Sequence, residues 1–91
     1  MTPRPCLRRR IRGRPQSFYF KPSGIPVREL ENVTLTLAEF EAVRLVDFEQ
    51  IPQTKAAKKM EISQPTLSRI LTSARKKISE AIIKGKAIEI E

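Results

Sequence analysis

The chain has 91 residues, a length that suits one small domain with an arm better than two domains. It carries 18 Lys and Arg against 10 Asp and Glu, and the resulting net charge of +8 favours polyanionic partners, nucleic acid first and acidic membrane surface second. With no histidine and a single cysteine, Cys6, the composition excludes an intramolecular disulfide, zinc-finger ligation within one chain and the common histidine-based triads. We therefore expect a protein that is not an enzyme and that holds no metal or cofactor.

The chain also lacks the apolar segments that direct or anchor a protein to a membrane. No apolar run approaches the length of about 20 residues that a membrane-spanning helix needs. The basic N-terminus is not followed by an apolar stretch of the secretory type. A lone cysteine suits a reducing interior. From these features we expect a cytoplasmic protein with no membrane partner.

Residues 1–17 form the first predicted segment, a flexible arginine-rich arm. They contain six arginines and three prolines but no acid, a composition that predicts disorder in the free protein. Such an arm can neutralise phosphates when DNA is present. Within it, residues 12–15 (RGRP) resemble the core of an AT-hook, whose flat backbone lies in a narrow A·T-rich minor groove. The arginines predicted to contact DNA are Arg8, Arg9, Arg10, Arg12 and Arg14.

Residues 18–35 form a second, extended segment rich in aromatic residues and proline. Phe18, Tyr19 and Phe20 follow one another, and residues 22–26 read as a turn or extended loop. We interpret the aromatic side chains as a cap on the helical core; stacking on splayed bases is the alternative, and it requires exposure. Residues 27–31 can form a short turn of helix.

The third predicted segment, residues 36–91, begins with a helix that runs to Phe48. Thr36 and Glu39 have the spacing of a capping box. Apolar residues fall on more than one face of this helix, so we expect it to be covered on two sides, the second by the aromatic segment or by a partner chain. Acidic residues gather between Glu29 and Glu49. Capping and a solvated face explain these acids more simply than a carboxylate metal site does.

Residues 53–71 have the pattern of a helix-turn-helix. Apolar residues are spaced so that two crossed helices share one core, and the small Ala57 falls where the helices approach most closely. Ser63 is a good N-cap for the second helix, and Pro65 is tolerated in its first turn. The turn contains Glu61 where glycine is common, so we expect a strained turn or a different turn geometry.

The apolar series continues beyond this pattern at steps of three and four residues, through Ile78, Ala81 and Ile82. It predicts one long helix that packs against the core throughout and ends near Lys84, with Gly85 as its C-cap. Residues 87–91 alternate in the manner of a short C-terminal β-strand. Such a strand needs an edge, either residues 33–35 of the same chain or the equivalent strand of a second protomer.

Three stretches together resemble a known family: residues 20–26 (FKPSGIP), residues 35–45 (LTLAEFEAVRL), and residues 68–77 (SRILTSARKK) followed by 85–88 (GKAI). They look like a family of small predicted DNA-binding proteins of unknown function, whose members carry a helix-turn-helix similar to region four of bacterial sigma factors. The resemblance covers nearly the whole chain and implies an all-α fold of that sigma-like type and DNA binding. Relatives tend to have a serine or similar cap at the position of Pro52 and a glycine at that of Glu61.

From the pattern and the resemblance we expect a DNA-binding protein that regulates transcription and inserts the helix from Ser63 into the major groove of double-stranded DNA. The polar face of that helix disfavours a packing unit that binds nothing. Two other functions remain open: a sigma-like interaction module that contacts RNA polymerase or another regulator, and an RNA-binding protein that uses the arginine arm. The predicted base-contacting residues are Gln64, Thr66, Ser68 and Arg69, and the predicted phosphate-contacting residues are Lys55, Lys58, Lys59, Arg75 and Lys76.

A homodimer is also expected, because one motif of this kind reads few base pairs and most such proteins pair to read two half-sites. The helix with two apolar faces and the unpaired terminal strand both motivate this prediction.

Overall fold

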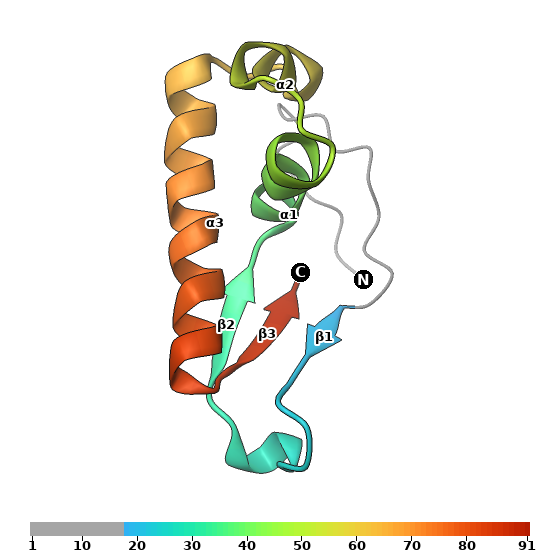
Figure 1. Cartoon of the computed structure of the whole chain (residues 1–91), viewed down its shortest axis with the longest axis vertical. Helices are drawn as coiled ribbons and strands as arrows, with labels where there is room; N and C mark the ends of the chain where they lie inside the picture. Colours follow the sequence, from blue (N-terminus) through green and yellow to red (C-terminus); the bar gives the residue numbers. More distant parts are fainter. Residues whose placement is uncertain (1–17) are drawn as a thin grey trace.

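The computed structural model describes residues 18–91. Within this range the chain is mostly helical and adds one small sheet (Figure 1). The predicted arginine-rich arm and its AT-hook-like residues lie outside the described residues. In chain order the elements are β1 (Tyr19–Phe20), the 3-10 turn η1 (Val27–Glu29), β2 (Asn32–Leu35), α1 (Leu37–Val43), the π-helical segment η2 (Arg44–Phe48), α2 (Gln53–Met60), α3 (Gln64–Lys84) and β3 (Ala87–Ile90).

The sheet has three strands in the order β1-β3-β2, with β3 in the centre. β1 pairs antiparallel with β3, and β2 pairs parallel with it, so that Val33 and Phe20 both lie opposite Ile88. The expected C-terminal strand is therefore confirmed, and its partner is residues 32–35 of the same chain. The prediction of an all-α fold was too narrow, since the chain has a three-stranded sheet in which β2 includes the expected residues 33–35 and β1 was not expected.

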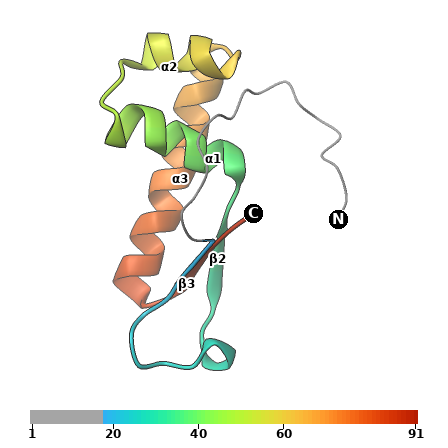
Figure 2. The ribbon, with the colours of Figure 1, turned by 90° about the vertical axis from the view of Figure 1, so that its right-hand side faces the viewer.

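Alternation along the strands gives the sheet one apolar and one polar face. In β2, Val33 and Leu35 are buried while their neighbours are exposed. On the polar face the Tyr19 hydroxyl donates to Asn32 Oδ1 at 3.1 Å, and Asn32 Nδ2 donates to Glu89 Oε1 at 3.4 Å. The apolar face receives α3, which lies along one side of the sheet (Figure 2).

The prediction that the three aromatic residues cap the helical core is wrong, since none of them belongs to the two buried clusters. Phe18 and Phe20 are 54% and 51% exposed, while Tyr19 is half-buried on the polar face of the sheet. The physical reason is their position: β1 is a two-residue edge strand, and α3 packs mainly over β2 at the opposite edge. The core is instead closed by aliphatic side chains of the strands and helices.

The helix that begins after Thr36 has the predicted capping box. The Thr36 hydroxyl accepts from Glu39 N–H at 3.1 Å, and the Glu39 carboxylate accepts from Thr36 N–H at 2.8 Å. The helix continues into the π-helical η2, and its two faces are covered as expected. One face packs through Ala42 against α2 and α3; the other packs through Phe40 against a cluster with Leu35 of the sheet. The second cover is the chain's own sheet, and it comes partly from the segment 18–35 through Leu35 of β2 rather than from a partner chain.

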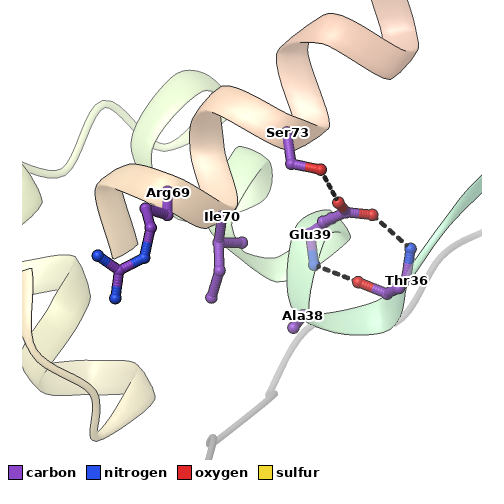
Figure 3. Close-up of a pocket in the computed structure, with 6 residues that line it drawn as sticks. All are labelled: Thr36, Ala38, Glu39, Arg69, Ile70 and Ser73. Atoms are coloured by element: carbon purple, nitrogen blue, oxygen red, sulfur yellow. Dashed lines mark hydrogen bonds between the residues drawn. The ribbon is translucent and has the colours of Figure 1, made fainter. Parts of the chain in front are cut away.

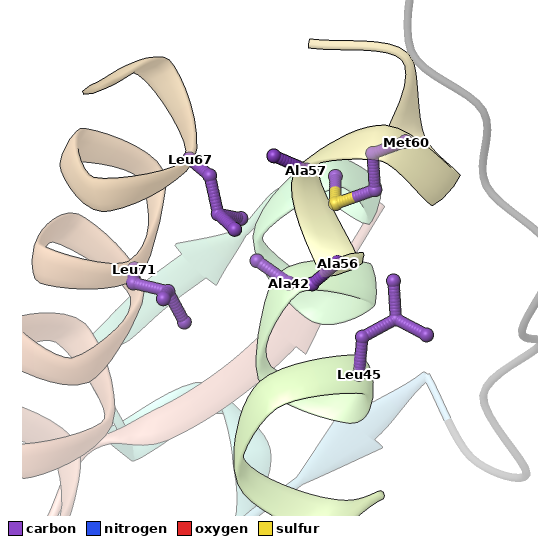
Figure 4. Packing of buried hydrophobic residues seen from close by; sticks show 7 residues of the cluster. All are labelled: Ala42, Leu45, Ala56, Ala57, Met60, Leu67 and Leu71. Carbon is purple, nitrogen blue, oxygen red and sulfur yellow. The ribbon is translucent and has the colours of Figure 1, made fainter. Parts of the chain in front are cut away.

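α2 and α3 cross over the core that α1 and η2 complete. Small side chains allow the close approach: Ala42, Ala56 and Ala57 are at most 3% exposed. Larger apolar side chains fill the remaining space, as Figure 4 shows. The full buried cluster consists of Ala42, Leu45, Ala56, Ala57, Met60, Leu67 and Leu71.

α3 is the long helix that the sequence predicts, and it ends at Lys84 with Gly85 as a left-handed C-cap at φ 67°. Its packing against the core is less extensive than expected. Ala81 is buried, but Ile82 is 72% exposed and Ile83 is 80% exposed. The prediction that the apolar series packs throughout is therefore wrong at Ile82, because the buried face of α3 runs through Ala74 and Ala81 and Ile82 lies outside it.

Candidate nucleic-acid interface

The candidate interface lies at the end of the molecule formed by α2 and the start of α3 (Figure 1). α2 turns Ala56, Ala57 and Met60 inward, so its remaining positions face solvent. Its N-cap is Pro52, which makes no side-chain capping bond to the helix. The three predicted phosphate-contacting residues of α2 are exposed, and none forms an ion pair with another described residue: Lys55, Lys58 and Lys59.

The turn from α2 to α3 is the strained turn that the sequence predicted. Glu61 adopts the left-handed conformation, with φ 59° and ψ 43°. Its backbone N–H reaches back to the carbonyl of Lys58 at 3.0 Å, while Ile62 N–H bonds the Ala57 carbonyl at 3.0 Å. These bonds satisfy backbone carbonyl groups at the C-terminal end of α2 and fix the angle between α2 and α3.

α3 begins as predicted. The Ser63 hydroxyl accepts from Thr66 N–H at 3.2 Å, and Pro65 occupies the first turn, where no backbone donor is lost. Of the four predicted base-contacting residues, Gln64, Ser68 and Arg69 are exposed. They emerge from the first two turns of α3 and make no ion pair within the described part of the chain.

Thr66 differs from the other three predicted base contacts. It is half-buried, and its hydroxyl oxygen accepts a hydrogen bond from the Ser63 hydroxyl at 2.8 Å. The side chain is thus part of the N-terminal cap of α3. Sequence reasoning missed Thr72, which is exposed one turn beyond Ser68 and donates to the Ser68 carbonyl at 2.9 Å. The spacing of Gln64, Ser68 and Thr72 by four residues is the signal that could have found it.

The two predicted phosphate contacts further along α3 have different surroundings. Arg75 forms a two-pronged ion pair with Asp47 of η2, at 2.7 Å from Nη2 and 3.2 Å from Nε. Hydrogen bonding to Asp47 raises the pKa of Arg75 further, so the guanidinium is charged but already paired. Lys76 is exposed and unpaired among the described residues. Lys76 is therefore the freer of the two cations.

A shallow hollow of about 380 Å³ opens beside Arg69, between α3 and the start of α1 (Figure 3). One side is apolar, made by Ala38 and Ile70. The other side holds the Glu39 carboxylate, which accepts from the Ser73 hydroxyl at 2.6 Å and from Lys77 Nζ at 2.9 Å.

The Glu39 carboxylate accepts hydrogen bonds from the Thr36 backbone, Ser73 and Lys77. Its side chain is almost buried, at 8% exposure. Burial by itself would raise the pKa of the Glu39 carboxyl, but hydrogen bonds from Ser73, from the Thr36 backbone and from Lys77, with the charge of Lys77, hold it below its usual value. Lys77 Nζ also donates to the Thr34 carbonyl at 2.7 Å, so β2, α1 and α3 meet at this carboxylate.

Charge is unevenly distributed around the candidate interface. Residues 51–79 contain seven Lys or Arg and a single acid, Glu61. Within the described residues 18–91, no group of three or more His, Cys, Asp or Glu side chains is arranged to hold a metal ion. No helix in this part of the chain is long and apolar enough to cross a membrane.

The fold defines a class: a small, basic, mostly helical protein with a three-stranded sheet, in which two crossed helices present cationic and polar side chains at one end. The chain belongs to the DUF134 family of proteins of unknown function, whose model matches residues 1–91. It is similar to UPF0251 proteins of two organisms. The identity is 49% over 88 residues in Halothermothrix orenii and 51% over 89 residues in Caldanaerobacter subterraneus.

These relatives are longer than the chain. The matched region covers 97% of the chain and 65% of the Halothermothrix protein, and 98% of the chain and 75% of the Caldanaerobacter protein. A UPF0251 protein of Desulforudis audaxviator, 49% identical over 88 residues, is matched over 97% of the chain and 58% of its own length. The chain thus spans about two thirds of these relatives. No solved structure matches the chain.

Proposed function

We propose that the chain is a DNA-binding protein that regulates transcription, and that α2 and α3 act as a helix-turn-helix with the start of α3 in the major groove. The observation that carries the proposal is the end of the molecule where three exposed lysines of α2, which form no ion pair within residues 18–91, adjoin a polar, exposed face on the first turns of α3. Seven cations and one acid in residues 51–79 give this region the charge that a phosphate backbone attracts.

The proposed contacts divide into those that read sequence and those that fix position. Arg69 can donate two hydrogen bonds to a guanine edge, and Gln64 can pair with an adenine edge. Ser68 makes shorter contacts, and Thr72 lies on the same face one turn later. Thr66 is the weakest of the proposed base contacts because its hydroxyl belongs to the helix cap.

The side chains proposed to contact the phosphate backbone of DNA are cationic. Lys55, Lys58 and Lys59 would lie over phosphates and fix register without reading bases. Lys76 extends this footprint along α3, whereas Arg75 joins it only when its ion pair with Asp47 opens. The arm arginines Arg8, Arg9, Arg10, Arg12 and Arg14 are proposed to contact phosphates or the minor groove; they lie outside the described residues.

The proposal includes a homodimer that reads two half-sites in the cytoplasm, with no catalysis and no cofactor. The terminal strand no longer supports dimerisation, because β3 is paired on both sides within the chain. The remaining support is the exposed apolar surface, including Phe48 at 79% and Ile83 at 80%. The test is light scattering at high protein concentration: a dimer mass is expected, and a monomer contradicts this part of the proposal.

The exposed Phe48 also favours a second candidate function, a contact with RNA polymerase or another regulator. An exposed aromatic side chain is a common anchor in protein interfaces. The two functions are separable, since polymerase binding that survives Arg69→Ala supports an interaction module, whereas loss of DNA sequence preference in that variant supports direct readout.

Selection of bound sequences from a random pool of duplex DNA tests the main proposal. We expect one preferred sequence and an affinity that falls steeply with salt concentration. Arg69→Ala should lower the preference for that sequence, at a cost of about 1–3 kcal/mol on the preferred site. Lys58→Ala should weaken binding to all duplexes about equally and flatten the salt dependence. If both variants lose the same affinity on preferred and random DNA, Arg69 does not read bases.

A further inference from the structure

The Glu39 carboxylate joins three elements that are far apart in sequence. It belongs to the capping box of α1 and accepts hydrogen bonds from Ser73 and Lys77 of α3. Lys77 also donates to the Thr34 carbonyl, which links the carboxylate to β2. Figure 3 shows Ser73 and Glu39 pointing toward each other across the gap between α3 and α1. The hydrogen bond between them is short, at 2.6 Å.

We propose that Ser73 and Glu39 are positioning residues for the DNA-reading face of α3, because their hydrogen bond fixes the rotation of α3 about its own axis. This inference rests on the proposed function of α3 and adds how that helix is held. Arg69 precedes Ser73 by four residues, so both lie on the same side of the helix one turn apart. A contact that fixes the position of Ser73 therefore also fixes the Cα atom from which the Arg69 side chain extends.

The geometry makes this constraint tight. An α-helix is about 10 Å across with its side chains, so a rotation of about 20° would move the Ser73 hydroxyl by about 2 Å. Such a shift would stretch the 2.6 Å bond past the distance of about 3 Å at which O–H···O hydrogen bonds persist. The Arg69 guanidinium lies further from the helix axis and would move further. Base edges tolerate little displacement, because a bidentate contact needs both donors in place.

Burial makes the constraint specific to one orientation. The Glu39 side chain is 8% exposed, so breaking its hydrogen bond to Ser73 costs more than breaking one at an exposed site, although the hollow beside it is open to water. Apolar contacts alone tolerate small rotations, since neighbouring aliphatic groups still touch after a shift. The apolar cluster under α3 therefore supplies the attraction between the helices, while the buried hydrogen bond selects the angle.

The experiment compares Ser73→Ala with Ser79→Ala. Ser79 is an exposed serine on the same helix, so its replacement controls for the loss of a hydroxyl and for helix propensity. The readout is the ratio of the affinity for the preferred duplex to the affinity for random duplex. We expect Ser73→Ala to lower this ratio about tenfold, as for a weakened bidentate base contact, and to leave the affinity for random DNA within about twofold. Ser79→Ala should leave both quantities unchanged.

A double variant separates positioning from general loosening of the fold. If Ser73 acts by positioning α3, Ser73→Ala should lower the ratio by a smaller factor in an Arg69→Ala background than in the wild type, because only the contacts of Gln64 and Ser68 remain to be displaced. Glu39→Gln keeps the shape of the side chain but removes the negative charge that attracts the donors Ser73 and Lys77. This variant should lower the affinity ratio as Ser73→Ala does. An unchanged ratio in Ser73→Ala and Glu39→Gln would overturn the inference alone. A wild-type chain that selects no DNA sequence would overturn the proposed function itself.

Discussion

Glu61 holds the left-handed backbone position between α2 and α3, where a side chain is unfavourable. We predict that Glu61→Gly is more stable than Glu61→Ala by about 1 kcal/mol, because both variants lose the Glu61 side-chain contacts and only glycine relieves the strain. Urea denaturation of the two variants measures the difference in the free energy of unfolding. Equal midpoints would show that the turn holds no such strain.

Asp47 holds Arg75 in an ion pair, which competes with the proposed contact of Arg75 with a DNA phosphate. We predict that Asp47→Asn strengthens binding to all duplex DNA, because it frees Arg75 to make one more phosphate contact. The slope of log K against the logarithm of the salt concentration should become steeper by about 0.9. Folding stability should change by less than about 1 kcal/mol, since Arg75 and Asp47 are 50% and 39% exposed. Titrations of duplex DNA at several salt concentrations measure the slope.

The matched control for this prediction is Glu29→Gln. It removes the same charge from η1, which lies at the opposite end of the molecule from α2 (Figure 1). The slope should remain that of the wild type in Glu29→Gln. If both variants steepen it equally, the effect is one of net charge, and Arg75 does not contact DNA.

At the scale of elements, α1 and α3 depend on a carboxylate whose pKa lies below its usual value of 4.5. A group with a lowered folded-state pKa stabilises the fold above its unfolded-state pKa, and the contribution disappears as pH falls through the folded-state value. We predict that the free energy of unfolding declines on acidification below about pH 4.5 partly through Glu39, and that the decline is shallower in Glu39→Gln. Urea denaturation at a series of pH values checks this. An equal decline of the free energy of unfolding with falling pH in the wild type and in Glu39→Gln would contradict this prediction.

Local signals predicted the ends of elements well. The Thr36 capping box, the Ser63 cap and the Gly85 stop each depend on residues within one turn of the helix end, and each is present. Contacts between distant segments were not predictable in this way. The Arg75–Asp47 ion pair and the Ser73–Glu39 hydrogen bond each join residues about 30 positions apart. Contacts over such a separation produce no recognisable pattern in the sequence.

The same distinction applies to the apolar residues and to the candidate interface. Periodicity predicted the long α3, but it could not show that the core ends before Ile82 or that Phe18 and Phe20 lie beyond the helices. For the interface, the exposure of the α2 lysines followed from the pattern, and their contact with DNA stays a prediction. The paired state of Arg75 and the capping role of Thr66 emerged only from the structure.

At the scale of the whole molecule, β3 closes the fold by joining β1 to β2. We predict that Ile90→Ala, at 5% exposure, costs about 2–5 kcal/mol, because it opens a cavity between the sheet and the helices. Ile83→Ala, at 80% exposure within one chain, is the control and should change the free energy of unfolding by at most about 0.5 kcal/mol at a low protein concentration, at which the proposed dimer dissociates. Chemical denaturation of both variants measures the difference. Similar losses in the two would mean that Ile83 is covered in solution.

The central position of β3 also sets the order in which the chain can fold during synthesis. β1 and β2 leave the ribosome long before β3, and neither strand has a neighbour to pair with until residues 87–90 emerge. α2 and the first turns of α3 depend on contacts that are closer in sequence, and such contacts form sooner. The half of the molecule that carries the proposed DNA interface can therefore assemble while the sheet is still open. Hydrogen exchange should reflect the same hierarchy in the finished protein, with the amides of β1 exchanging before those of α2.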